Sequence, residues 1–362
     1  MIIAIYVTLF FIILRFVVTL FNFLSNPKLP HIAHPHYAKV SILIPARNEA
    51  ENIIALLESI AKHDNQKYEV LILDDHSTDN TYELCQTFAA THSNFRVIKG
   101  AELPAGWLGK NYACHQLAQQ ATGDYFLFLD ADEVIYPGLL NSAIHRMQLR
   151  NLALLSLFTN QQMLSFGEKA VVPLMHYILL NLLPLRLVYL LKNPMIAAAS
   201  GQFMLFDAAL YRRYEWHQLV KEKVVEDVEI MKCIKAKKYN GETLLANGMI
   251  SCRMYKSYGE TINGFGKNFL AAFNYSIPGF LVYLTLLIAG PLIVIMTMNM
   301  PLIFFMAGLI ILSRIMVSFL SGQSALMNII LHPIQMFNLV VIAFTSIQKH
   351  LTKTTVWKGR RV

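Results

Sequence analysis

Short apolar runs alternate with amphipathic stretches through the middle of the chain, between residues 39 and 260. Continuous apolar runs bounded by Gly, Asp or Pro are typical of strands that are buried on both faces of a parallel sheet. They predict strands at 40–44, 68–73, 95–98, 125–129, 152–158 and 200–207, with a further apolar segment at 249–255. Amphipathic spacing predicts helices at 51–63, 81–90, 111–120, 137–150 and 224–235. This alternation predicts an α/β domain with a mostly parallel sheet flanked by helices.

Both ends of the chain are more apolar than the middle. Residues 2–24 contain Arg15 and few other polar residues, and a membrane crossing takes roughly 20 apolar residues. A cleaved signal peptide is the alternative, but the segment lacks a basic start and a clear small-residue cleavage site. We expect five regions: a transmembrane helix at 1–25, a Pro-containing linker at 26–38, a catalytic domain at 39–260, membrane helices at 277–348 and a basic tail at 349–362.

The C-terminal region offers three candidate spans, at 278–298, 301–320 and 326–347. The positive-inside rule places the basic tail in the cytoplasm, and the catalytic domain is expected there too. Three complete spans would instead put the tail on the opposite side. One segment therefore does not cross fully, and the candidates are the span that bears Arg314 and the one interrupted by His332-Pro333. We expect a multi-pass protein of the cell membrane.

Composition narrows the class of protein further. With 55% hydrophobic and 15% charged residues, the chain is unlike a typical soluble domain. The net charge of +8 suits anionic lipid headgroups or an anionic substrate. No basic run is interleaved with aromatic residues, so we expect no nucleic-acid partner. Residues 171–192 are strongly apolar but contain Pro173 and Pro184, which favours an interfacial helix pair over a straight span. An ordinary buried helix is the alternative.

Carboxylates stand at the ends of three predicted elements. They are the pairs Asp74/Asp75, Asp130/Asp132 and Glu226/Asp227. Ligands of open α/β sheets gather at the carboxyl ends of the strands, so the first two pairs should meet along one edge. An Asp-x-Asp pair offers the oxygen ligands that Mg²⁺ and Mn²⁺ prefer. The third pair has a competing structural reason, because the helix dipole favours acids in the first turn.

These acidic pairs, in this order and with Pro45-Ala46-Arg47-Asn48-Glu49 after the first strand, resemble the family 2 glycosyltransferases of GT-A fold. The resemblance covers roughly residues 39–255. The segments 106–111, 253–255 and 357–360 are similar to bacterial carotenoid glycosyltransferases, the enzymes that act on diaponeurosporenoate or chlorobactene.

The resemblance implies a role for each candidate on the donor side. Pro45, Ala46 and Glu49 would line the nucleotide base and ribose. Asp74 or Asp75 would hold the uracil or ribose, with Asp75 favoured.

The remaining candidates would act on the diphosphate and the acceptor. Lys110 would lie near the base or diphosphate, and Asp130 near the ribose or the metal shell. Asp132 would ligate the divalent cation, Mg²⁺ or Mn²⁺. Asp227, with Glu226 beside it, would supply the general base.

The resemblance therefore implies an inverting enzyme that moves a hexose from a UDP-sugar to a lipophilic acceptor at the lipid bilayer. By the same resemblance the acceptor would be a carotenoid or related isoprenoid, with polyprenyl phosphate and glycerolipid as alternatives. The Gln-x-x-Arg-Trp motif of processive members is missing, and the corresponding region is 264–269, which favours a single transfer. His76 stands where the family usually has Gly or a small residue.

A catalytically inactive scaffold of the same fold is an alternative from another class of function. A nucleotidyltransferase is a third possibility, but it would need a basic Gly-rich loop near the first strand, and Pro45-Ala46-Arg47-Asn48-Glu49 does not supply one.

Overall fold

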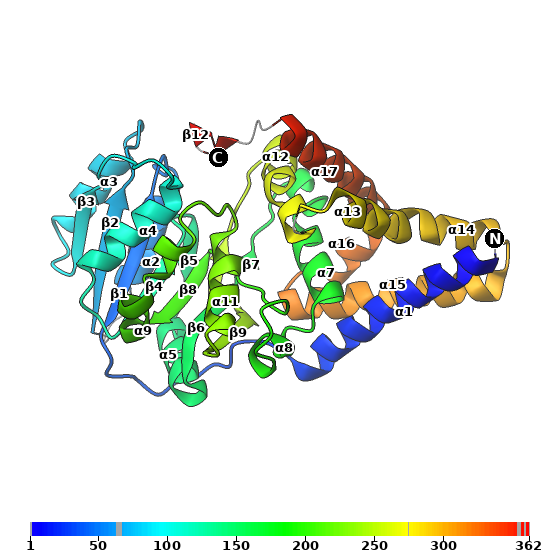
Figure 1. Cartoon of the computed structure of the whole chain (residues 1–362), viewed down its shortest axis with the longest axis horizontal. Coiled ribbons are helices and arrows are strands. Elements are labelled where there is room, and N and C mark those ends of the chain that lie inside the picture. The colour runs from blue at the N-terminus through cyan, green and yellow to red at the C-terminus, as the bar shows by residue number, and fades with distance from the viewer. Residues whose placement is uncertain (1, 63–66, 274, 353–355, 358–359, 362) are drawn as a thin grey trace.

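The structure is a computed structural model that describes residues 2–62, 67–273, 275–352, 356–357 and 360–361 (Figure 1). It consists of an α/β domain and a group of apolar helices that extends from this domain as an arm. The first helix of the chain belongs to the arm, where it packs against helices from the last quarter of the sequence.

A seven-stranded sheet forms the centre of the α/β domain. Its order is β3 (Phe95–Lys99), β2 (Tyr68–Asp74), β1 (Val40–Ala46), β4 (Tyr125–Leu129), β8 (Phe203–Asp207), β6 (Leu152–Phe158) and β9 (Asn240–Leu245). Only β8 runs antiparallel to its neighbours, β4 and β6. The predicted α/β class with a mostly parallel sheet is therefore confirmed. A smaller sheet of β5 (Glu133–Ile135), β10 (Ile250–Cys252) and β7 (Asn160–Gln161) stands beside it.

Helices cover both faces of the large sheet. One face packs against α2 (Ile53–Ala61) and α5 (Leu139–Arg150), and the other against α4 (Gly109–Gln120) and α11 (Glu226–Ala236). Ile53, Leu56, Leu57 and Ile60 of α2 are fully buried, as their helical spacing predicted. Each such side chain contributes about 1.5–3 kcal/mol by leaving water, so this pattern stabilises the layer. Short helices complete the domain: α3 (Thr81–Ala89), α6 (Phe166–Lys169), α9 (Ala208–Tyr214) and α10 (Trp216–Leu219).

Strand β9 was not predicted from the sequence, because its polar residues break the apolar pattern. Glu242 in this strand is fully buried, and Arg146 of α5 binds it through two nitrogens, with Nε 2.6 Å from Oε2 and Nη2 2.5 Å from Oε1. A second arginine also contacts this acid, because Nη1 of Arg186 lies 3.6 Å from Oε1 of Glu242. A buried charge with such partners does not prevent strand formation.

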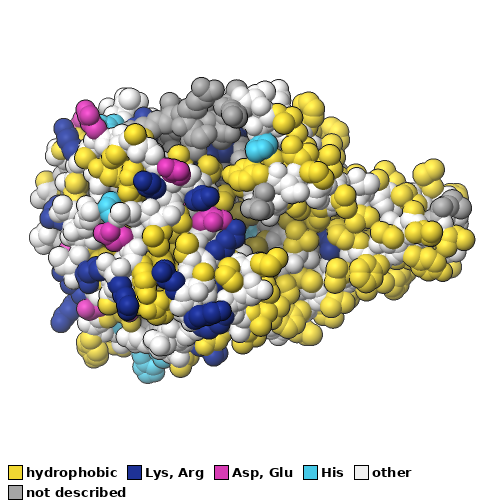
Figure 2. Space-filling view, in the orientation of Figure 1, with side chains coloured by type: hydrophobic (Ala, Val, Ile, Leu, Met, Phe, Trp, Pro, Cys, Tyr) yellow, Lys and Arg dark blue, Asp and Glu magenta, His cyan; other side chains and the backbone are white. Residues whose placement is uncertain are grey.

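Apolar helices lie near both ends of the chain, as predicted. Three helices of the described part are long and apolar enough to cross a membrane: α1 (Ile2–Ser25), the segment Ile277–Met296 and α15 (Met300–Ser321). The middle segment comprises α13 (Ile277–Leu284), a π-helical turn and α14 (Gly290–Met296). These helices form the arm, whose visible face carries many hydrophobic side chains and almost no charged ones (Figure 2).

The last candidate span is not one continuous helix. It consists of α16 (Ala325–Ile330) and α17 (His332–Thr352), and it is not among the three helices that suit a crossing. The start of α1 and the turn after α14 lie at the far tip of the arm, and α15 leads back to its base (Figure 1). There α17 packs against α12 (Tyr258–Asn268), next to the α/β domain. The residues of the predicted tail at 353–355 and 358–359, which include Lys353 and Lys358, lie outside the described residues.

The predicted interfacial segment 171–192 forms two helices, α7 (Pro173–Leu182) and α8 (Arg186–Leu190), on either side of Pro184. Helix α7 contacts both α1 and α15. Leu174, Tyr177 and Leu180 of α7 are nearly fully buried. Much of the apolar surface of α7 is therefore covered by the chain's own helices, and α7 joins the arm to the α/β domain.

Candidate active site

A cavity of about 910 Å³ opens at the carboxyl ends of β1 and β4. Parallel strands of an α/β sheet place their following loops at this edge, which is why residues from distant parts of the sequence meet there. Helix α12 and the end of α17 line the opposite wall. The cavity thus lies at the junction between the α/β domain and the helices at the base of the arm (Figure 1).

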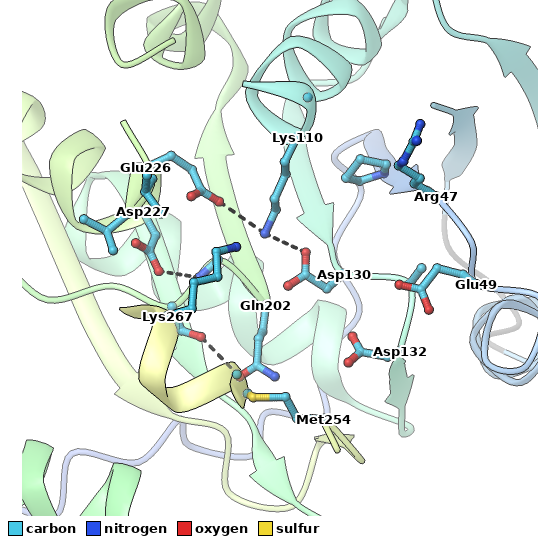
Figure 3. A pocket seen from close by; sticks show the side chains of 18 of the residues that line it. Arg47, Glu49, Lys110, Asp130, Asp132, Gln202, Glu226, Asp227, Met254 and Lys267 are labelled. Atoms are coloured by element: carbon cyan, nitrogen blue, oxygen red, sulfur yellow. Dashed lines mark hydrogen bonds and ion pairs between the residues drawn. The ribbon is translucent and has the colours of Figure 1, made fainter. Parts of the chain in front are cut away.

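Lys110 links two of the acidic pairs at the centre of the cavity (Figure 3). Its Nζ lies 2.7 Å from Oδ1 of Asp130 and 3.2 Å from Oε1 of Glu226. Burial lowers the pKa of Lys110, but Asp130 and Glu226 together raise it well above its usual value. Gly201 allows this approach, because a Cβ at this position would lie 3.0 Å from Nζ of Lys110 and 3.1 Å from Oε1 of Glu226.

Asp227 lies on the same wall and is held by two backbone amides. The N–H of Gly201 donates to Oδ2 at 2.9 Å, and the N–H of Val228 donates to Oδ1 at 2.8 Å. Burial and the neighbouring Glu226 raise the pKa of Asp227 to about 7, against the opposing effects of Lys110 and the two amides. A carboxyl group whose pKa lies near neutral pH is suited to accept a proton.

Asp132 faces the cavity from the other side, below Glu49 (Figure 3). The thiol of Cys252 in β10 donates to its Oδ2 at 3.2 Å. Burial, Asp130 and Glu49 raise the pKa of Asp132 to about 6. Asp132, Glu133 and Cys252 place possible metal-ligand atoms within 4.8 Å of one another.

Glu133 is the most deeply buried member of this group. Its side chain is fully buried, Oε2 is without a hydrogen-bond partner, and Oε1 accepts a long hydrogen bond from Thr159 at 3.4 Å. Burial raises the pKa of Glu133 well above its usual range. Carboxylate oxygens with an unsatisfied lone pair fit a hard divalent cation. Asp130, by contrast, is directed toward Lys110 in this structure.

Only some of the residues predicted to bind the nucleotide line the cavity. Pro45 and Glu49 line the cavity, whereas Ala46, Asp74 and Asp75 are not among its lining residues. The N–H of Asp75 donates to the carbonyl of Ala46 at 2.8 Å, which joins the ends of β1 and β2. The assignment of Asp74 or Asp75 to the uracil or ribose stays a prediction.

The backbone conformation of His76 is one that favours glycine, so the histidine at this position is under strain. Its φ is +55°, a left-handed conformation that glycine adopts most easily. The Nε2 of His76 lies 3.3 Å from the carbonyl oxygen of Ala101, and the guanidinium of Arg47 donates to the His76 carbonyl at 3.1 Å. These contacts hold the loop in the strained conformation.

Several residues that line the cavity were not among the predicted site residues. Lys267 of α12 lies in a stretch that was assigned to no region, and Lys349 near the end of α17 was assigned to the basic tail. Burial lowers the pKa of Lys267 to about 8, although Glu226 raises it. The sequence did offer a clue to Lys267, because it lies within 264–269, the region that corresponds to the missing Gln-x-x-Arg-Trp motif. Lys349 gave no signal, since only the folding of α17 against α12 brings it near.

Comparisons with known proteins agree with this architecture. Residues 41–214 match the family model for glycosyl transferase family 2. The 4,4'-diaponeurosporenoate glycosyltransferase of Staphylococcus haemolyticus is 33% identical over 93 residues, which are 26% of this chain and 24% of that protein. The glycosyltransferase AglE of Haloferax volcanii is 33% identical over 95 residues, or 26% of this chain and 30% of that protein. The matches thus span between about a quarter and a third of these relatives.

One solved structure covers nearly the whole chain. The mannosyltransferase PcManGT from Pyrobaculum calidifontis, in complex with GDP-Man and Mn²⁺, superposes with a TM-score of 0.58 at 17% identity. The match covers 96% of this chain and 99% of that one. At this identity the likeness establishes the fold, and it confirms the GT-A type that the sequence predicted.

Proposed function

Because residues 41–214 match the family model for glycosyl transferase family 2, we propose that the chain is a membrane-bound, inverting, non-processive glycosyltransferase. It moves a hexose from a UDP-sugar to a lipophilic acceptor, a carotenoid or related isoprenoid. One observation carries the proposal: a single cavity brings together Asp132, the Lys110-linked acids and Asp227, where the α/β domain meets the apolar helices.

The donor occupies the side of the cavity formed by β1 and β4. Pro45 and Glu49 line the part that takes the nucleotide. Asp132, with the carboxyl group of Glu133 beside it, would hold Mg²⁺ or Mn²⁺. A divalent cation there supplies Lewis-acid stabilisation of the negative charge that develops on the leaving nucleoside diphosphate. The Mn²⁺ bound with GDP-Man in PcManGT supports the use of a divalent cation.

Asp227 acts on the acceptor. With a pKa of about 7, its carboxylate takes the proton of an acceptor hydroxyl as the oxygen attacks the anomeric carbon. One displacement on the face opposite the leaving group inverts the configuration at that carbon. An acceptor that is itself a carboxylate is already ionised, and Asp227 then orients it without taking a proton.

With the arm inserted in a membrane, the cavity would lie beside the bilayer. If α1, α13–α14 and α15 cross the membrane, Lys349 and the end of α17 are on the same side as the α/β domain. The positive-inside rule then places both in the cytoplasm. This arrangement removes the conflict between charge and span number, because the segment interrupted by His332-Pro333 does not cross. A lipophilic acceptor then reaches the cavity from the membrane side.

The test uses membranes that carry the full chain, incubated with labelled UDP-glucose, Mg²⁺ or Mn²⁺ and a total lipid extract. Label should enter the organic phase with the wild-type protein and be lost with Asp132→Ala. Glu58→Ala removes an exposed carboxylate of α2 and serves as the matched control, which should retain activity.

The labelled product decides among isoprenoid, polyprenyl phosphate and glycerolipid acceptors. Transfer that survives Asp132→Ala unchanged would contradict the mechanism. UDP-glucose binding without transfer to any lipid, repeated over a panel of nucleotide sugars, would favour an inactive scaffold.

A further inference from the structure

Two arginines are buried at the base of the apolar arm, away from the catalytic cavity. Arg15 of α1 is 6% exposed and Arg314 of α15 is 2% exposed. Both guanidiniums lie against Tyr177 of α7, with their Cζ atoms 5.0 Å and 3.5 Å from the centre of its ring. The two Cζ atoms are thus separated by no more than the sum of these distances, which a single phosphate group is able to bridge.

Neither positive charge has a carboxylate partner among the described residues. The salt bridges of the described chain involve other cations. Arg314 donates from Nε and Nη2 to Nδ1 of His332, at 2.9 and 2.7 Å, so this ring nitrogen is an acceptor without a proton. Nε and Nη2 of Arg15 are buried without a hydrogen-bond acceptor, and the one side chain that hydrogen-bonds its guanidinium is the neutral Tyr177, among the described residues.

Such a pair is unfavourable without an anion. Aromatic rings, here Tyr177 and Phe11, stabilise a guanidinium only weakly compared with a charged partner. Buried polar groups are nearly always hydrogen-bonded, and intramembrane cations usually pair with an anion or with backbone carbonyls. Arg15 instead has two N–H donors without an acceptor, and its guanidinium lies against the same Tyr177 ring as that of Arg314.

The depth of the pair in the arm indicates the source of the anion. Arg314 lies about 10 Å along the helix from the domain-side end of α15 at Ser321, and Arg15 about 15 Å from the end of α1 at Ser25. Long arginine side chains extend from such depths toward the membrane surface. Lipid phosphates lie at that surface, and the planar fork of a guanidinium binds two phosphate oxygens at once.

We propose that Arg15 and Arg314 bind the phosphate group of a membrane phospholipid at the junction of α1, α15 and α7. The lipid would connect the arm to the catalytic domain, because Met175 of the same α7 helix lines the catalytic cavity. This inference stands independently of the proposed transfer reaction. It predicts that the protein retains phospholipid during purification and is stabilised by it.

The experiment uses the full chain purified in detergent. Lipid phosphorus that remains bound is measured per protein, and the thermal midpoint is recorded with added phosphatidylglycerol or with inorganic phosphate. Arg15→Gln and Arg314→Gln remove one charge each. Arg213→Gln is the matched control, since Arg213 is exposed and lies 5.3 Å from the ring centre of Tyr214 in the α/β domain.

Wild-type protein and Arg213→Gln should retain phospholipid and gain thermal stability with phosphatidylglycerol. Each Gln variant at the site should bind it about tenfold more weakly or worse, because a charged hydrogen-bond partner is lost. An equal stabilisation by inorganic phosphate would assign the site to free phosphate and overturn the lipid. Equal retention by the wild-type protein and both site variants would also overturn the proposal.

Two further measurements keep the proposal open to refutation if a Gln variant fails to fold. Arg15→Lys keeps the charge but loses the fork, and it should bind phosphatidylglycerol with intermediate affinity. The wild-type protein alone gives the second measurement. Complete removal of phospholipid without any change in its thermal midpoint would overturn the proposal.

Discussion

Replacing Glu226 by Gln should move the acid limb of the pH–rate profile to lower pH. Asp227 is the proposed base, and its pKa of about 7 arises from burial first and from the charge of Glu226 second. Gln has the same shape but no charge, so the burial remains and the repulsion disappears. A neighbouring like charge raises the pKa of a carboxyl group, and its removal should lower that of Asp227 by about one unit.

The rate of the wild-type enzyme should follow the ionised fraction of Asp227. A base with a pKa of about 7 is half ionised at pH 7 and only about one-tenth ionised at pH 6. The value of kcat/KM for an acceptor with a hydroxyl group should therefore fall about tenfold per unit below pH 6. In Glu226→Gln the same fall should begin about one unit lower.

The assay measures kcat/KM at low acceptor concentration from pH 5 to 9, which reports the free enzyme. Lys110 also contacts Glu226, so Lys110→Met provides the opposite control. It removes a cation that lowers the pKa of Asp227 and should move the limb to higher pH. Acid limbs that coincide in the wild-type enzyme and Glu226→Gln would refute the assignment of Asp227 as the titrating base.

Three further perturbations test other parts of the structure. Asp132→Ala should lower transfer at least about a hundredfold and weaken the binding of Mn²⁺, which isothermal titration measures directly; unchanged Mn²⁺ affinity would contradict its role as ligand. Gly201→Ala should lower kcat with little change in thermal midpoint, because its Cβ would displace the ammonium of Lys110. Arg146→Met should destabilise the fold by about 3 kcal/mol, since it leaves the buried Glu242 with only the distant Arg186, and a thermal midpoint equal to the wild-type value would contradict this.

The sequence by itself determined the elements of the α/β domain and the edge at which its acids gather. The apolar runs that became β1, β2, β4 and β6 are buried on both faces of the sheet, and such runs reveal their structure locally. The acidic pairs follow from the same logic, because strand direction decides which loops share an edge. The apolar helices near both ends were equally visible, since length and composition alone define a possible crossing.

The tertiary structure alone decided which side chains contact one another. Cys252 reaches Asp132 across a sequence separation of 120 residues, and Asp130 faces Lys110, not Asp132. Strand β9 carries a buried acid whose partners lie on other elements, so its local pattern concealed it. Arg15 and Arg314 are isolated polar residues in apolar helices as far as the sequence goes, and only the packing of α7 brings both guanidiniums against Tyr177. The physical reason is that periodicity reflects the backbone geometry of one element, whereas pairing of buried charges depends on how separate elements pack.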